Sequence, residues 1–396
     1  MADRIVQRTY FFDSLRHLFQ GALDSAFLTI CLLISIRVFH APNGLKSVLS
    51  SLTWLGGALA PALTRLAARS GRPAARIGAL LFFAIGCCFL GAARAQSFIL
   101  FLLPVACASV CYRAEGSVLI GMYAANYGAE QRASRLALGL TLSALLAVAL
   151  GQIGGIALDR DLANHRPLLQ VIAACSWCCS LCLLAIPSPP VRRPSGQPWR
   201  GYLPFLWKDP TFGRLTLHFC LVGIAYQMLV PIRMEYLANG RYGMDLANGR
   251  VMLLAWVVPN LARVASTQLF GFLFDRFRLI PLRIANNLLT FAAFWIFFHG
   301  KNFGTLILGA GCMGMAMAGS YVFHSLWISK VAPEERLPAY MSLYLLVTGV
   351  RSMVAPLLAY ALLAVLSPTG VANFAGLLIA WSTLGFWRLR RVETIR

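Results

Sequence analysis

Charged side chains are scarce in this chain. Only 12% of its 396 residues are Asp, Glu, Lys or Arg, whereas 59% are hydrophobic. Soluble domains carry about a quarter charged residues, and a chain of this length could not bury so much apolar surface in a core. The composition therefore excludes an ordinary soluble protein and favours a membrane protein.

Motifs for nucleotide or metal chemistry are absent. The sequence contains no G-x-x-x-x-G-K-[ST] phosphate loop and no H-E-x-x-H metal motif, and its six histidines are scattered over different predicted loops and spans. The first absence excludes a P-loop ATP hydrolase, and the second weighs against a membrane-embedded metalloenzyme. We therefore expect neither enzymatic activity nor a bound cofactor.

Acidic residues are also few, with 14 Asp and Glu against 35 Lys and Arg, which gives a net charge of +21. Such an excess can indicate nucleic-acid binding, but here the basic residues gather in particular loops, for example Arg65, Arg69, Arg72 and Arg76. This distribution matches the positive-inside bias and contact with anionic lipid. It predicts cytoplasmic N- and C-termini in a bacterial inner membrane, with no nucleic-acid partner.

Long apolar runs divide the chain into twelve predicted transmembrane helices. Their approximate ranges are 14–38, 45–66, 77–94, 97–124, 136–158, 167–187, 213–236, 248–272, 281–299, 302–328, 339–365 and 370–388. Each run is about long enough to cross the hydrocarbon core, where backbone groups must be satisfied within a helix. The prediction is an all-α membrane protein with an N-terminal bundle over 1–187, a cytoplasmic linker over 188–212 and a C-terminal bundle over 213–396.

The two predicted bundles carry similar loops at similar positions. Leu273 and Arg276 lie 207 residues after Leu66 and Arg69, and the PEER loop at 333–336 lies 204 residues after the AEQR loop at 129–132. Recurrence at nearly one offset indicates a duplicated six-helix unit.

One of these loops resembles the G-x-L-x-D-R-x-G-R signature of the major facilitator superfamily. The matching residues are Gly271, Leu273, Asp275 and Arg276 in the second half and Leu66, Arg69, Gly71 and Arg72 in the first, where Ala68 replaces the Asp. The resemblance implies twelve transmembrane helices in two pseudo-symmetric six-helix bundles, and a transporter that works by alternating access. We expect Arg69, Arg72, Gly271, Asp275 and Arg276 to form a cytoplasmic latch between conformations.

Ionisable residues within the predicted spans are unevenly distributed. Asp24 lies in the first span, Arg113 and Glu115 in the fourth, Arg263 in the eighth and Arg351 in the eleventh. The interiors of the third, sixth, ninth and twelfth spans are expected to contain no charge. Because buried charge is costly in lipid, the charged helices are expected to surround an aqueous cavity and the others to face lipid.

Arg113 and Glu115 are about 200° apart around a helix, so each requires another partner. The resemblance implies that the first and fourth helices both line the cavity, so we expect Asp24 to pair with Arg113 or, if protonated, to neighbour Glu115. The RAEG stretch at 113–116 also resembles an R-x-x-Q-G pattern of proton antiporters. Asp24, Arg113 and Glu115 are therefore the predicted proton-coupling residues, with a permanent salt bridge and sodium coupling as the alternatives.

The predicted spans contain more arginines than carboxylates, which favours an anionic or zwitterionic solute. The candidate substrate-cavity residues are Tyr226, Gln227, Trp256, Asn260, Arg263, His324 and Arg351. Ordinary interhelical packing is the alternative for each of them. Cys175, Cys178 and Cys182 share one helical stripe, but thiols also pack well between helices, and we expect no metal site.

Taken together, these patterns predict a secondary active transporter that moves a small organic solute across the plasma membrane, with protons as the coupling ion. Membrane lipids are its expected surroundings, and a monomer is its expected state. A lipid transporter or scramblase, or a non-transporting receptor on the same scaffold, is the alternative.

Overall fold

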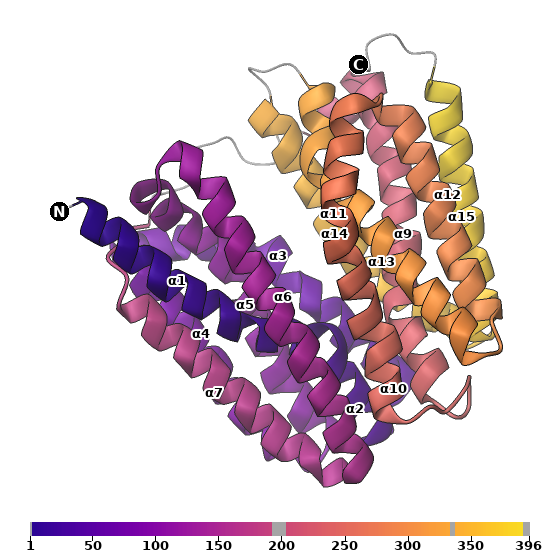
Figure 1. Cartoon of the computed structure of the whole chain (residues 1–396), viewed down its shortest axis with the longest axis horizontal. Helices are drawn as coiled ribbons and strands as arrows, with labels where there is room; N and C mark the ends of the chain where they lie inside the picture. The colour runs from indigo at the N-terminus through magenta and orange to yellow at the C-terminus, as the bar shows by residue number, and fades with distance from the viewer. Residues whose placement is uncertain (1, 192–202, 333–336, 391–396) are drawn as a thin grey trace. The chain divides into compact units, whose positions relative to one another are not determined.

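The computed structural model describes residues 2–191, 203–332 and 337–390 (Figure 1). Within these ranges the regular structure is helical, apart from one isolated β-bridge between Pro73 and Pro190. The chain forms two compact units. One comprises Met1–Ser195 with Leu246–Met252, and the other comprises Gly196–Asp245 with Leu253–Arg396. We call these units 1 and 2.

Unit 1 contains the first six long helical segments. They are α1 (Ala2–Ser25), continued by the π-helical turn η1 (Ala26–Ile30) and α2 (Cys31–Arg37), then α3 (Asn43–Arg69), α4 (Ala74–Ala93), α5 (Phe98–Asn126), α6 (Ala129–Arg160), and α7 (His165–Leu184) after the short η2 (Leu162–Asn164). The short α10 (Asn248–Met252) belongs to the same unit.

Unit 2 contains a second set of long helices. They are α9 (Pro210–Ala238) after the short α8 (Phe205–Lys208), α11 (Val258–Arg276) after the π-helical η4 (Leu253–Val257), α12 (Leu279–His299), α13 (Phe303–Leu326) followed by η5 (Trp327–Lys330), α14 (Leu337–Leu363) and α15 (Pro368–Leu389).

Ten helices in the described part of the chain are long and apolar enough to cross a membrane. They coincide with ten of the twelve predicted spans, and the first begins earlier than predicted, at Arg4. The other two predicted spans correspond to α3 and to the continuous run from α10 through α11, which are not among the ten. The all-α membrane fold is confirmed, whereas twelve crossings stays a prediction.

Polar side chains at the helix starts explain several boundaries. Asp209 accepts a hydrogen bond from the Phe212 amide at 3.0 Å, and Asn302 accepts one from the Thr305 amide at 2.8 Å. Ser367 does the same for Gly370 at 3.1 Å, with proline at the first position of the following helix. Each cap satisfies an amide that has no partner within its own helix.

Close approach of α1 and α6 shapes the interior of unit 1. A Cβ on Gly21 would lie 2.9 Å from the Ala147 nitrogen and would overlap the Ser143 carbonyl oxygen. Only glycine at this position lets the two backbones come so near. The contact places α6 beside the polar face of α1.

The segment Leu246–Met252 is held on unit 1 through its backbone. Asp159 of α6 accepts hydrogen bonds from the Asn248 amide and, at 2.8 Å, from the Gly249 amide. Arg37 donates to the Asn248 side chain at 3.1 Å. The carboxylate therefore caps the start of α10, which the sequence did not indicate.

Candidate functional site

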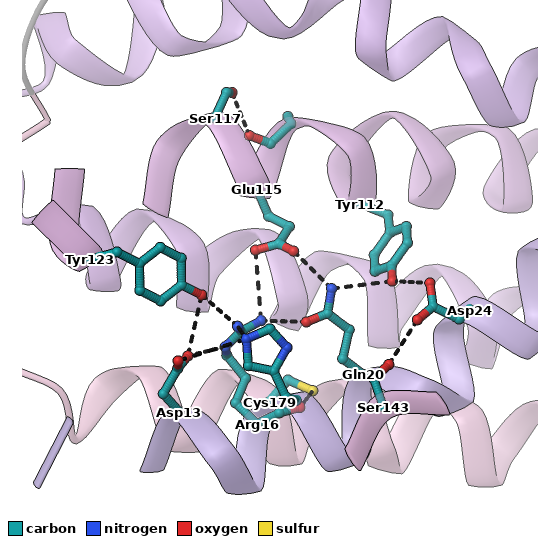
Figure 2. Close-up of polar contacts among 12 residues, drawn as sticks. Asp13, Arg16, Gln20, Asp24, Tyr112, Glu115, Ser117, Tyr123, Ser143 and Cys179 are labelled. Atoms are coloured by element: carbon teal, nitrogen blue, oxygen red, sulfur yellow. Dashed lines mark hydrogen bonds and ion pairs between the residues drawn. The ribbon is translucent and has the colours of Figure 1, made fainter. Parts of the chain in front are cut away.

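Arg16 lies at the centre of a buried polar network in unit 1 (Figure 2). Its Nε is 3.0 Å from Oδ1 of Asp13, and its Nη1 is 3.8 Å from Oε2 of Glu115. The Arg16 guanidinium also donates to Gln20 Oε1 and, at 2.7 Å, to the Tyr123 hydroxyl. Only 1% of Arg16 is exposed, so these groups replace its water.

A hydrogen-bonded chain extends from this centre to Asp24. Gln20 Nε2 donates to Glu115 Oε1 at 2.9 Å and to the Tyr112 hydroxyl at 3.2 Å. The Tyr112 hydroxyl donates to Asp24 Oδ1 at 2.6 Å, and Ser143 Oγ donates to Asp24 Oδ2 at 2.8 Å. Gln20 and Tyr112 thus connect two carboxyl groups (Figure 2).

Further groups surround the Asp13 end of the network. The hydroxyls of Tyr123 and Tyr127 donate to Asp13 at 3.3 and 3.5 Å, and Nε2 of His17 lies 3.7 Å from its Oδ2. The residues come from α1, α5 and α6, with Tyr127 directly after α5. We call Asp13, Arg16, Gln20, Asp24, Tyr112, Glu115, Tyr123 and Ser143 the acidic network.

Three carboxyl groups and one guanidinium make up the ionisable core of the acidic network. Asp13 is 3% exposed and Glu115 is 7% exposed, whereas Asp24 is partly exposed. Burial favours the neutral form of a carboxyl group, and a neighbouring guanidinium favours the charged form. One arginine cannot neutralise three carboxylates, so the arrangement is suited to holding a proton.

The expected pairing of Asp24 with Arg113 is wrong. Arg113 Nε donates to the Thr53 carbonyl at 3.2 Å, and its guanidinium lies 4.5 Å from the centre of the Trp54 ring. Both partners belong to α3, and the guanidinium also lies 6.0 Å from the centre of the Tyr112 ring. Arg113 thus does not join Asp24 and Glu115, although all three were predicted to act together.

Asp13 lies just before the expected start of the first span at residue 14, whereas Arg16 and Gln20 lie in its first two turns and were not predicted as site residues. The helix in fact begins at Ala2. Asp13, Arg16, Gln20 and Asp24 follow one another at spacings of three and four, which places them on one face of a helix. This polar stripe was visible in the sequence.

The structure brings the predicted substrate-cavity residues together only in part. Asn260 donates to the Trp256 carbonyl at 2.7 Å, and Gln227 donates to Ser352 at 3.4 Å. Arg263 lies 5.2 Å from the Tyr321 ring centre and is an electrostatic neighbour of Tyr226. The bond from Asn260 to Trp256 lies within one helical run, whereas the contacts of Gln227 and Arg263 join different helices of unit 2.

His324 and Arg351 belong to another group in unit 2. His324 Nδ1 lies 3.0 Å from the Tyr344 hydroxyl, and Arg351 Nη1 donates to the Phe219 carbonyl. Arg283 of α12 joins them, as an electrostatic neighbour of Tyr344 and Arg351. It is only 3% exposed, so the expectation that the ninth span contains no buried charge is wrong.

Four of the five predicted latch residues are exposed, and Gly271 within α11 is partly exposed. Arg69 ends α3 and Arg72 follows three residues later, and Asp275 and Arg276 end α11. Arg276 lies 4.3 Å from the Phe272 ring centre. The PEER loop at 333–336 lies outside the described residues, and the latch stays a prediction.

Neither the acidic network of unit 1 nor the group of Arg283, His324 and Arg351 in unit 2 resembles a metal centre. Among the residues that the structure describes, no cluster of three or more His, Cys, Asp or Glu side chains is arranged to hold a metal ion. The chemistry that the two groups offer is proton binding in unit 1 and positive charge in unit 2.

A known family matches most of this sequence. The sequence profile described as Major Facilitator Superfamily matches residues 18–298, which is more than half of the chain. The chain belongs to the major facilitator superfamily. No match was found among curated proteins.

Solved structures of this superfamily have a similar fold. The nucleoside transporter NupG is 14% identical, with a TM-score of 0.75 over 97% of this chain and 98% of that one. A D-xylose–proton symporter is 14% identical, with a TM-score of 0.70 over 97% of each chain. A POT family transporter in complex with 5-aminolevulinic acid is 12% identical, with a TM-score of 0.72 over 99% of this chain and 97% of that one. At these identities the likeness shows the fold, which is that of a multi-pass membrane transporter.

Proposed function

We propose that this member of the superfamily is a proton-coupled secondary active transporter of a small organic solute, with anionic or zwitterionic solutes favoured. The observation that supports the proposal is the acidic network, in which two carboxyl groups, Asp13 and Glu115, contact the Arg16 guanidinium. A third carboxyl group, Asp24, is connected to Glu115 through Tyr112 and Gln20. The similar structures include transporters of nucleosides and of D-xylose with protons, which agrees with a small polar solute.

Asp24 and Glu115 are the proposed proton-carrying groups. Asp24 is partly exposed and Glu115 is buried, and Tyr112 and Gln20 connect them through hydrogen bonds. Arg16 lies beside Glu115 and Asp13, so any movement of its guanidinium changes which carboxyl group it stabilises as an anion. Solute binding or helix movement can therefore load or release a proton.

Asp24→Asn and Glu115→Gln should abolish acceleration of transport by a pH gradient. Each amide keeps the size of the side chain but cannot bind and release a proton at neutral pH. Uridine, D-xylose and 5-aminolevulinic acid would first be screened for thermal stabilisation of the purified protein, since a ligand that binds the folded form raises its stability. Flux of the stabilising solute would then be measured in proteoliposomes.

We expect wild-type flux to rise with a pH gradient, and flux of both variants to remain at the level without a gradient while solute exchange continues. Asp161→Asn is the matched control, because Asp161 is an exposed helix cap outside the acidic network. Gradient-driven flux that persists unchanged in both variants would refute proton coupling at these residues. Transfer of a fluorescent phospholipid between leaflets of the same vesicles, without solute flux, would support the lipid-transporter alternative.

A further inference from the structure

Positive charge without acidic partners gathers inside unit 2. Arg283 of α12 lies with its guanidinium carbon 4.7 Å from the Phe219 ring centre and 5.2 Å from the Phe323 ring centre. Arg351 of α14 reaches the Phe219 carbonyl of α9. Both arginines are electrostatic neighbours of His324. Three helices thus contribute two guanidinium groups and an imidazole, and both arginines contact Phe219 of α9.

Neither guanidinium is neutralised by a carboxylate. The Nε atoms of Arg283 and Arg351 are buried and have no hydrogen-bond acceptor, and no Asp or Glu in the described ranges forms an ion pair with either side chain. The buried carboxylate of unit 2, Glu235, is 0% exposed and accepts hydrogen bonds from Tyr360 and Asn239. Arginines inside a membrane protein that lack an acidic partner are costly and mark ligand paths.

Gly223 makes room for Arg351. A Cβ on Gly223 would overlap the Nη1 and Cζ atoms of Arg351. The guanidinium therefore crosses α9 where that helix has no side chain, and its Nη1 is fixed on the carbonyl one turn earlier. Nε of this positioned arginine lies against the same part of α9 and has no hydrogen-bond acceptor.

We propose that Arg283 and Arg351 bind an oxyanion, the carboxylate or phosphate group of a small organic solute. The Arg283 guanidinium lies against the rings of Phe219 and Phe323, and its N–H groups form a fork that matches the paired oxygens of a carboxylate or phosphate. His324 and Tyr344 add hydrogen-bond donors beside Arg283. His324 and Arg351 are partly exposed, so a ligand can reach this group of side chains from outside. Identification of this oxyanion group with part of the transported solute rests on the proposed function, whereas the binding itself does not.

Matched pairs of probes would test the site by thermal shift of the full chain in detergent at constant ionic strength. Sodium benzoate would be compared with benzamide, and glucose 6-phosphate with glucose. We expect the anion of at least one pair to stabilise the protein and its neutral partner to have no such effect. The pair that responds distinguishes a carboxylate from a phosphate ligand.

Loss of one charge-assisted contact should weaken anion binding about tenfold to a hundredfold. We expect this for Arg351→Gln and for Arg283→Lys, which keeps the charge but loses the planar fork. Gly223→Ala should have the same effect by displacing Arg351, without altering any charged group. Arg241→Gln is the matched control, because Arg241 is exposed and stacks on Tyr242, outside the group formed by Arg283, His324 and Arg351.

Equal stabilisation by anions and neutral partners, or undiminished anion binding in the Arg351 and Arg283 variants, would overturn the proposal. Arg351→Gln and Arg283→Lys both retain a polar side chain, so each variant is expected to fold. A cooperative melting transition without ligand checks this for each variant. Anion binding that persists in a protein without gradient-driven flux would leave this site in place while removing proton coupling. Gradient-driven flux of a solute in a protein that binds no anion would support proton coupling and refute the oxyanion site.

Discussion

Arg16→Gln should destabilise the protein strongly. The change removes the guanidinium that lies beside Asp13 and Glu115, both less than 10% exposed. Removal of one partner from a buried ion pair costs about 3 to 5 kcal/mol, because the remaining charge has no compensation. We expect a large fall in melting temperature and in the yield of monodisperse protein after detergent extraction.

Arg8→Gln is the matched control for this substitution. Arg8 lies on the same helix, eight residues before Arg16, and is exposed. Its loss should change stability by about 0.5 kcal/mol or less. Equal melting temperatures for the Arg16 and Arg8 variants would contradict the central place of Arg16 in the acidic network. Recovery of stability in Arg16→Gln on lowering the pH would support it, since protonation then neutralises the unpaired carboxylates.

Gly21→Ala should also be strongly destabilising, although it adds a single methyl group to a helix. The added Cβ would lie 2.9 Å from the Ala147 nitrogen and would overlap the Ser143 carbonyl, both in the backbone of α6. A backbone cannot move aside as a side chain does, so α1 and α6 must separate. Overpacking of this kind costs about 1 to 3 kcal/mol. Separation would also lengthen the hydrogen bond from Ser143 to Asp24.

Gly121→Ala provides the opposite result from the same chemical change. Gly121 lies within α5, and a Cβ there would meet nothing within 4 Å. Alanine has a higher helix propensity than glycine, by about 1 kcal/mol. We therefore expect a rise in melting temperature for Gly121→Ala and a fall for Gly21→Ala, measured side by side. A similar response of both variants would exclude close packing of α1 on α6.

The helices were predictable because hydrophobic length is a local property of the sequence. Runs such as 77–94 and 370–388 lie within three residues of α4 and α15 at both ends. The starting point of α1 was not predictable in the same way. Its first turns carry charge, and hydropathy alone placed them before the first span, although Asp13 and Arg16, on either side of the predicted boundary, are both buried.

The partners of buried charges could not be predicted from charge alone. Arg113 binds a backbone carbonyl and an aromatic ring, neither of which is distinguished in the sequence from the many others. Arg283 lies four residues after the start of α12, where a long side chain can either reach water or turn inward. Its burial depends on Phe219 and Phe323, which come from other helices.

The π-helical turn η1 begins two residues after Asp24 and therefore links its surroundings to helix geometry. A π-turn accommodates one extra residue, and its conversion to α geometry would rotate the preceding part of α1 by about 100° relative to α2. Such a screw motion would carry Asp24 away from both Tyr112 and Ser143 at once. A one-residue change of register within a single turn would then suffice to exchange the surroundings of a carboxyl group without unfolding the helix that carries it.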